Sequence, residues 1–140
     1  MRIRGRAISK GVAEGEVIYT SQPVSFLGGV DPKSGRIIER GHELHGRSIA
    51  NKVFVFPCGK GSTVGSYVIY QLKLNGTAPV AMINEETEPI VAVGAIISEI
   101  PVVDRLEKKI EWRNGMRVRV NGTEGYVEIL EDCGSCKKLH

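Results

Sequence analysis

A chain of 140 residues and 15.3 kDa fits one compact domain, since a chain of that length buries roughly two-thirds of the surface that its unfolded form exposes. Hydrophobic residues make up 41% and charged residues 25% of the chain, which excludes a disordered or fibrous protein. The net charge of +3 comes from scattered residues, and the stripe of Arg2, Arg4 and Arg6 is typical of a solvated strand face, so we expect no nucleic-acid partner.

The first half of the chain predicts strands and one long loop. Ile3 and residues 15–19 indicate two short strands, and glycines bracket a bend between them. Residues 21–35 are rich in Gly and Pro and predict a loop whose apolar side chains, Val24, Phe26 and Leu27, are buried anchors. Residues 36–39 predict a short strand. Residues 52–56, a continuous apolar run, predict a strand buried on both faces.

Helices and strands alternate in the second half. Helical spacing of Val64, Val68 and Leu72 predicts a helix over residues 62–75 that stops at Asn75-Gly76. A buried strand is expected over 80–83. Thr87-Glu88-Pro89 resembles an N-cap, so 88–98 predicts a second helix, although its β-branched residues also fit a strand. An extended segment at 102–103 and a hairpin of 116–120 with 125–129 follow.

This order of elements mixes sheet and helix without regular βαβ alternation, so the predicted fold class is α+β, a β/β/α sandwich. Residues 1–131 are expected to form the single domain, and residues 132–140 a flexible tail. The longest apolar run, Ile90 to Ile97, is about half of a membrane span, and no leader pattern opens the chain. Three cysteines do not describe a disulfide framework, so we expect a cytoplasmic protein with no membrane partner.

The strongest motif is the strand that runs through Pro57-Cys58-Gly59-Lys60-Gly61 to Ser62 at the start of a helix. Free amides at a helix start, the positive end of the helix dipole and flexible glycines favour an anion there, and Lys60 adds a positive charge. The glycine spacing matches neither the dinucleotide motif nor a Walker loop. From spacing alone, a glycine-rich turn with Ser62 as an ordinary N-cap is the simpler interpretation.

Three segments carry a resemblance: SFLGGVDPKSGRI, GKGSTVGSYVIYQL and APVAMINEETEPIVAVGAII, at residues 25–37, 59–72 and 78–97. They resemble the small subunits of the archaeal aconitase X group, of the phosphomevalonate dehydratase type, and the resemblance runs from about residue 2 to 130. It implies a swivelling domain like the C-terminal domain of aconitase, made as a separate chain. It also implies a heterodimer whose large subunit holds a [4Fe-4S] cluster, with no metal on this chain.

The implied reaction removes water from a phosphorylated hydroxy acid, (R)-mevalonate 5-phosphate, to give trans-anhydromevalonate 5-phosphate in a modified mevalonate pathway for isoprenoids. The resemblance implies that Ser62 is the catalytic base. An unperturbed serine is a poor base, so its anion needs fixed donors, for which the amides of Gly61, Ser62 and Thr63 are candidates. Lys60 is expected to assist the base or to contact the substrate phosphate. Aconitases proper have an arginine two positions after the serine, where this chain has Val64.

Several other residues have both a functional and a structural interpretation. Gly28-Gly29 permits close backbone approach to a substrate, or forms a turn in which Asp31 caps its own backbone. For His42 and His45 the sequence offers no further metal ligands, so structural or surface roles are favoured.

The carboxylates of Glu85, Glu86 and Glu88 fit either acid–base chemistry or the start of the second helix, and the second interpretation is favoured. Cys58 is expected to be a buried small hydrophobe, and Cys133, Cys136 and His140 to belong to the tail rather than to half a zinc site.

Two alternatives to the phosphomevalonate reaction stay open. Another aconitase X activity, such as dehydration of a hydroxyproline, would use the same serine and the same partner. A non-catalytic phosphate-binding swivelling module would share the fold, but a phosphohistidine carrier needs a histidine near Ser62, and no histidine occurs between His45 and His140.

Overall fold

The computed structural model describes residues 1–131, which form one eight-stranded sheet, one two-stranded sheet and three helices. The eight strands of the large sheet are β1 (Arg2–Arg4), β2 (Arg6–Ser9), β3 (Val12–Tyr19), β5 (Val53–Phe56), β7 (Ala81–Asn84), β8 (Val102–Asp104), β9 (Arg117–Asn121) and β10 (Tyr126–Glu131). The small sheet pairs β4 (Val24–Ser25) with β6 (Gly59–Lys60). The helices are α1 (Phe26–Gly29), α2 (Gly65–Asn75) and α3 (Pro89–Ser98).

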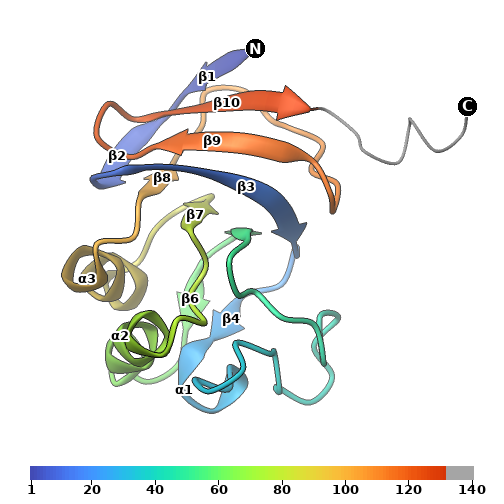
Figure 1. Cartoon of the computed structure of the whole chain (residues 1–140), viewed down its shortest axis with the longest axis vertical. Helices are drawn as coiled ribbons and strands as arrows, with labels where there is room; N and C mark the ends of the chain where they lie inside the picture. The colour runs from blue at the N-terminus through green and yellow to red at the C-terminus, as the bar shows by residue number, and fades with distance from the viewer. Residues whose placement is uncertain (132–140) are drawn as a thin grey trace, which may run out of the picture.

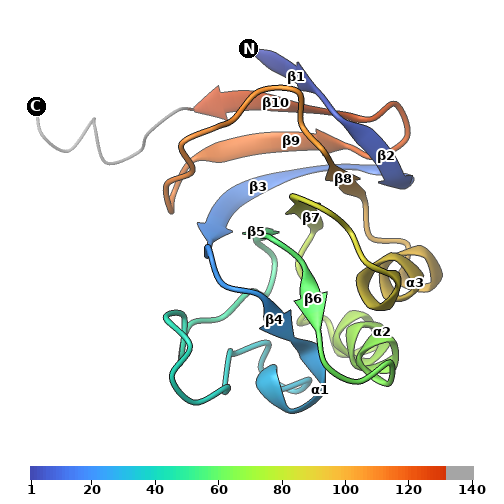
Figure 2. The same cartoon turned by 180° about the vertical axis from the view of Figure 1, so that it is seen from behind.

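The large sheet has the order β1-β10-β9-β3-β5-β7-β8-β2. Strands β3, β5, β7 and β8 run parallel, whereas β9, β10, β1 and β2 join by antiparallel pairing. Its two edges, β1 and β2, are separated in the chain by Gly5 alone, so the sheet curls until they meet (Figures 1 and 2). A Cβ at Gly5 would lie 2.5 Å from the Asp104 carbonyl oxygen, which explains why this bend contains glycine.

Two hydrophobic cores lie on opposite faces of the parallel strands. One core packs α2 and α3 against residues such as Phe54, Phe56 and Met82, and the other fills the curled half of the sheet with residues such as Val53 and Val55. Both helices lie on the same side of the parallel strands, and β9 and β10 lie on the other (Figure 1). This arrangement confirms the predicted β/β/α sandwich. Among the helices of residues 1–131, none is long and apolar enough to cross a membrane.

The structure corrects the limits of both long helices. Helix α2 begins at Gly65 and not at residue 62, because residues 62–64 form a turn closed by bonds three residues apart. Its end is as predicted, with Gly76 in the left-handed conformation at φ 73°. Helix α3 is capped by Glu88 and not by Thr87, because the Glu88 carboxylate accepts the amides of Ile90 and Val91 at 2.8 and 3.0 Å. A carboxylate at that end also complements the helix dipole.

The N-terminal third departs further from prediction. Three strands replace the expected two before residue 20, and residues 21–35 contain β4 and α1 rather than irregular chain alone. Val24 and Phe26 are buried as expected, but Leu27 is 45% exposed. Residues 36–39 are not a strand, since only isolated bridges, Val30 to Ile37 and Arg36 to Ser48, pair them. Local β-propensity does not suffice where no neighbouring strand offers a ladder.

Asp104, fully buried at the end of β8, joins three elements. Arg6 on β2 donates to both its carboxylate oxygens at 2.9 and 2.8 Å, and the Thr87 amide ahead of α3 donates at 2.7 Å. Burial opposes ionisation of this carboxyl, but the hydrogen bonds from Arg6 and Thr87 outweigh burial and hold its pKa below the usual range. The folded state therefore favours ionised Asp104.

Replacing Asp104 with Asn is expected to lower the unfolding free energy by on the order of 2 kcal/mol at pH 7. This is less than the roughly 3–5 kcal/mol for breaking a fully buried pair, because the Arg6 side chain is 40% exposed and solvent screens it. The stabilisation is complete above the ordinary carboxyl pKa of about 3.9 and disappears as the pH falls through the lower pKa of the folded state. Urea unfolding between pH 7 and about pH 3 measures both effects.

The matched control is Glu86→Gln, which removes a 59% exposed carboxylate that pairs with Arg6 and Arg105 and should cost under about 1 kcal/mol. Equal pH dependence of unfolding in the parent and in Asp104→Asn would contradict the role given to Asp104.

Candidate functional site

Ser62 lies in an exposed turn between β6 and α2. Its hydroxyl oxygen accepts the Val64 amide at 3.1 Å, and its carbonyl accepts the Gly65 amide at 2.9 Å. The first hydrogen bond of α-helical spacing runs from the Val68 amide to the Val64 carbonyl. Ser62 therefore stands ahead of α2 and organises the turn that leads into it, with its side chain accessible to a ligand.

Three successive backbone amides before α2 are free to donate. Within residues 1–131, no hydrogen bond is formed by the amides of Gly61, Ser62 or Thr63, and all three residues are exposed. Gly61 has φ +90°, and a Cβ there would lie 2.8 Å from the Ser25 hydroxyl oxygen. Glycine is thus required both by the left-handed backbone and by the approach of β4. Such amides can bind an anionic oxygen.

Lys60, two residues before Ser62, is held by a carboxylate that the sequence did not point to. Its ammonium lies 3.0 Å from the Glu39 Oε2 atom, in a pair that is 49% exposed at Lys60 and 27% at Glu39. The contact spans 21 residues of chain, and Glu39 sits in a segment that predicted only a strand. The sequence could indicate only that Glu39 carries a charge opposite to that of Lys60. Which of the acidic residues lies near Lys60 is decided by the tertiary structure.

The Gly28-Gly29 pair lies at the same site. The Gly29 carbonyl accepts the amides of Ile38 and Glu39, and a Cβ at Gly29 would come within 3.2 Å of the Glu39 Oε1 atom. Gly28 has φ +85° with open space around it. Asp31 caps its own turn, accepting from the Lys33 amide and the Ser34 hydroxyl, and these bonds lower its pKa. The structure thus brings Gly29 next to Glu39, the residue that pairs with Lys60.

The acidic residues after β7, Glu85, Glu86 and Glu88, have different contacts, and two of them are structural. Glu88 caps α3, as the structural interpretation expected. Glu86 accepts from Arg105 at 2.8 and 2.7 Å, and that hydrogen bonding lowers its pKa, so it is held ionised on the surface. The carboxylates of Glu86 and Glu88 are therefore engaged by Arg105 and by the start of α3, and not by Ser62. The Glu85 side chain instead faces a separate pocket.

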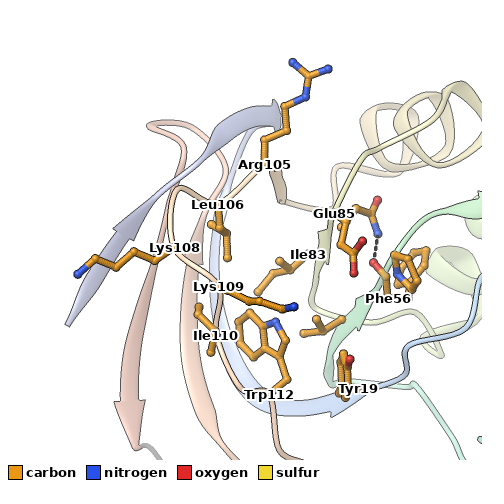
Figure 3. A pocket seen from close by; sticks show the side chains of 13 residues that line it. Tyr19, Phe56, Ile83, Glu85, Arg105, Leu106, Lys108, Lys109, Ile110 and Trp112 are labelled. Carbon is orange, nitrogen blue, oxygen red and sulfur yellow. Dashed lines mark hydrogen bonds between the residues drawn. The ribbon is translucent and has the colours of Figure 1, made fainter.

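That pocket, of about 340 Å³, opens at the carboxyl ends of the parallel strands β3, β5 and β7. Ile83, Ile110 and Trp112 contribute apolar walls, and Lys109 and Glu85 project toward the cavity from opposite sides (Figure 3). Sequence reasoning missed it because residues 105–115, which form one wall, carry no regular pattern. Ligand sites are common at the carboxyl edge of parallel strands, and this rule is the one by which the pocket could have been predicted from the sequence.

His42 and His45, for which the sequence favoured structural or surface roles, lie in different environments. His42 is buried and its Nδ1 atom accepts the Leu44 amide at 3.1 Å, whereas His45 is exposed. Within residues 1–131, no group of three or more His, Cys, Asp or Glu side chains could hold a metal ion. Cys58 is half-buried rather than fully buried, and burial, with Glu88 and Glu85 nearby, raises its pKa. Cys133, Cys136, His140 and the predicted tail lie outside the described residues.

Comparisons with known proteins agree with this fold. A family model described as the aconitase X swivel domain matches residues 2–129. The chain is 61% identical to a protein of Methanosarcina acetivorans named phosphomevalonate dehydratase small subunit, over 96% of this chain and 95% of that protein. It is 56% identical to a protein of the same name from Thermococcus kodakarensis, over 94% and 98%.

Two solved structures are similar over nearly the whole chain. A crystal structure titled Thermococcus kodakaraensis aconitase X, holo-form, has a TM-score of 0.89 at 55% identity and covers 94% of this chain and 99% of that one. A solution NMR structure of a UPF0107 protein has a TM-score of 0.82 at 47% identity, over 94% and 100%. Since the family model and these relatives extend over almost its full length, the chain belongs to the aconitase X swivel-domain family.

Proposed function

We propose that this chain is the small subunit of a hydro-lyase that converts (R)-mevalonate 5-phosphate to trans-anhydromevalonate 5-phosphate. The observation that carries the proposal is its identity of 52–61% with proteins named phosphomevalonate dehydratase small subunit, over 92–99% of the chain. An accessible serine beside three free amides supports a catalytic contribution from this chain.

In the proposed reaction, Ser62 removes the proton from the carbon next to the substrate carboxylate. The C–H electron pair forms the new C=C bond, and the hydroxyl on the neighbouring carbon leaves with its C–O electron pair, so that one water is lost overall. Ser62 needs its anion stabilised to act as a base. The Val64 amide already donates to its hydroxyl oxygen at 3.1 Å, and a donor favours the charged form.

The large subunit is proposed to complete the site. A [4Fe-4S] cluster held there would supply a Lewis acid for the departing hydroxyl. Among the described residues, no group of three or more His, Cys, Asp or Glu side chains could hold a metal ion. The Ser62 turn is exposed, and within residues 1–131 no acidic or basic side chain is hydrogen-bonded to its hydroxyl. Val64, in place of an arginine, leaves the substrate carboxylate to be bound by other groups.

Replacing Ser62 with Ala is expected to lower kcat of the assembled two-chain enzyme by about 10²-fold or more, because loss of a general base removes at least that factor. Turnover of mevalonate 5-phosphate under anaerobic conditions measures it. The matched control is Thr63→Val, which keeps the backbone amide and removes only the neighbouring hydroxyl, and should stay near parent turnover. Ser62→Ala turnover within tenfold of the parent would remove Ser62 as the base.

A partner that closes over Ser62 must also cover the apolar side chains beside it. Val64 lies two residues and Tyr67 five residues after Ser62 in the chain, and their exposed fractions are 47% and 67%. Tyr67→Glu is therefore expected to weaken binding to the large subunit by about tenfold or more, since it would bury a charge in place of an aromatic contact. Calorimetric titration of one subunit with the other gives the affinity.

The control for this variant is Val12→Glu, at a 56% exposed position at the start of β3, where Val12 pairs with Asn121 of β9. Equal affinities of Tyr67→Glu and Val12→Glu for the large subunit would show that the partner does not close over the start of α2.

A further inference from the structure

A second pocket, of about 200 Å³, lies beside the Ser62 turn. Lys60 on β6 forms part of its wall, and Gln22, Glu39, Arg40 and His42 contribute the other polar side chains. Its volume exceeds the roughly 30 Å³ that a water molecule occupies in the liquid several times over, so it can admit a group of several heavy atoms. Its lining comes from three separate chain segments that only the fold brings together.

The buried imidazole of His42, a lining residue, carries a hydrogen-bond donor without a partner among residues 1–131. The Leu44 amide donates to His42 Nδ1 at 3.1 Å, so Nδ1 is an acceptor and the neutral ring carries its proton on Nε2. His42 is only 7% exposed, and its Nε2 atom has no partner within residues 1–131. An unpartnered buried donor is costly in a folded protein. A ligand group that accepts from Nε2 would remove that cost.

Donors outnumber acceptors around the pocket. The Arg40 guanidinium is exposed and forms no hydrogen bond or ion pair in the described part of the chain. Gln22 uses its carbonyl oxygen to accept the Glu43 amide at 2.9 Å, which leaves its NH₂ group available. Glu39 supplies the negative charge, and Lys60 neutralises it at 3.0 Å. Arg40 therefore gives the pocket a net positive charge, and the chemistry fits an anion with several acceptor oxygens.

We propose that this pocket binds the phosphate group of the substrate while Ser62 acts at the opposite, carboxylate end. The inference rests on the proposed function. The Cα atoms of Lys60 and Ser62 lie at most about 7 Å apart, since an extended residue spans no more than roughly 3.3–3.6 Å. In mevalonate 5-phosphate, a short chain of single bonds separates the carbon that loses its proton from the phosphorus, so one molecule can reach both places.

The decisive experiment compares Arg40→Gln with Arg47→Gln in the assembled two-chain enzyme. Arg47 is the control because it is exposed, lies in the same connection and does not line the pocket. Calorimetry with inorganic phosphate, and KM for mevalonate 5-phosphate, are measured for both. Arg40→Gln should weaken phosphate binding and raise KM by about tenfold, the scale of one lost charged hydrogen bond, with kcat near that of the parent.

Acetate, titrated in parallel, separates the two anionic ends of the substrate. If Arg40→Gln weakens acetate binding and leaves phosphate binding unchanged, the pocket takes the carboxylate and the proposal is wrong. It is also wrong if Arg40→Gln and Arg47→Gln bind phosphate equally. Should the enzyme fail to turn over mevalonate 5-phosphate while phosphate binding still depends on Arg40, the proposed function falls and the anion pocket remains.

The imidazole is tested by a pair of substitutions. His42→Gln places an amide N–H near the position of Nε2, whereas His42→Leu retains bulk and removes the donor. Phosphate should bind more tightly to the Gln variant than to the Leu variant when both have parent-like unfolding midpoints. Equal affinities in two folded variants would remove His42 from the phosphate site.

Discussion

Burial of β5 on both faces is the constraint on which this structure depends. Phe54 and Phe56 belong to the core under the helices, and Val53 and Val55 belong to the core inside the curled sheet. A strand shared by two cores has little freedom to shift, because a slip of one residue would exchange every side chain between the faces. The segment that follows β5 therefore leaves the sheet at a fixed place, and this segment carries Lys60 and Ser62.

Close backbone approach then sets the shape of the site. A Cβ at Gly59 would lie 2.5 Å from the Glu88 Oε1 atom, and one at Gly61 would lie 2.8 Å from the Ser25 hydroxyl. The glycines thus let the turn before α2 pack between the cap of α3 and strand β4. Pairing of β4 with β6 places the loop after β3 beside the loop after β5. Both loops extend from the carboxyl edge of parallel strands, where functional groups from different segments meet.

The charges at this edge divide the site into two parts with different chemistry. Around Ser62 the chain offers neutral donors, the free amides of the turn, which suit a small anionic oxygen. Around Lys60 it offers side chains with full charges, among them Arg40 and Glu39. That division fits the proposed function, in which this chain would position one end of a substrate and close against a partner.

Local periodicity and turn chemistry predicted the layered α+β fold, a buried strand at 52–56, the glycine stop of α2 and the terminal hairpin. The sequence placed Ser62 in the first turn of the helix, whereas the structure has Ser62 in a turn ahead of α2. The structure decided that α2 starts at Gly65 and that Glu88 caps α3, through hydrogen bonds two or three residues apart that the sequence pattern allowed at neighbouring positions as well. Tertiary structure also brings together residues that are far apart in the chain, in the ion pair of Glu39 with Lys60 and in the pocket that includes His42. The sequence could not predict these contacts, because no local pattern indicates which distant side chain the fold places nearby.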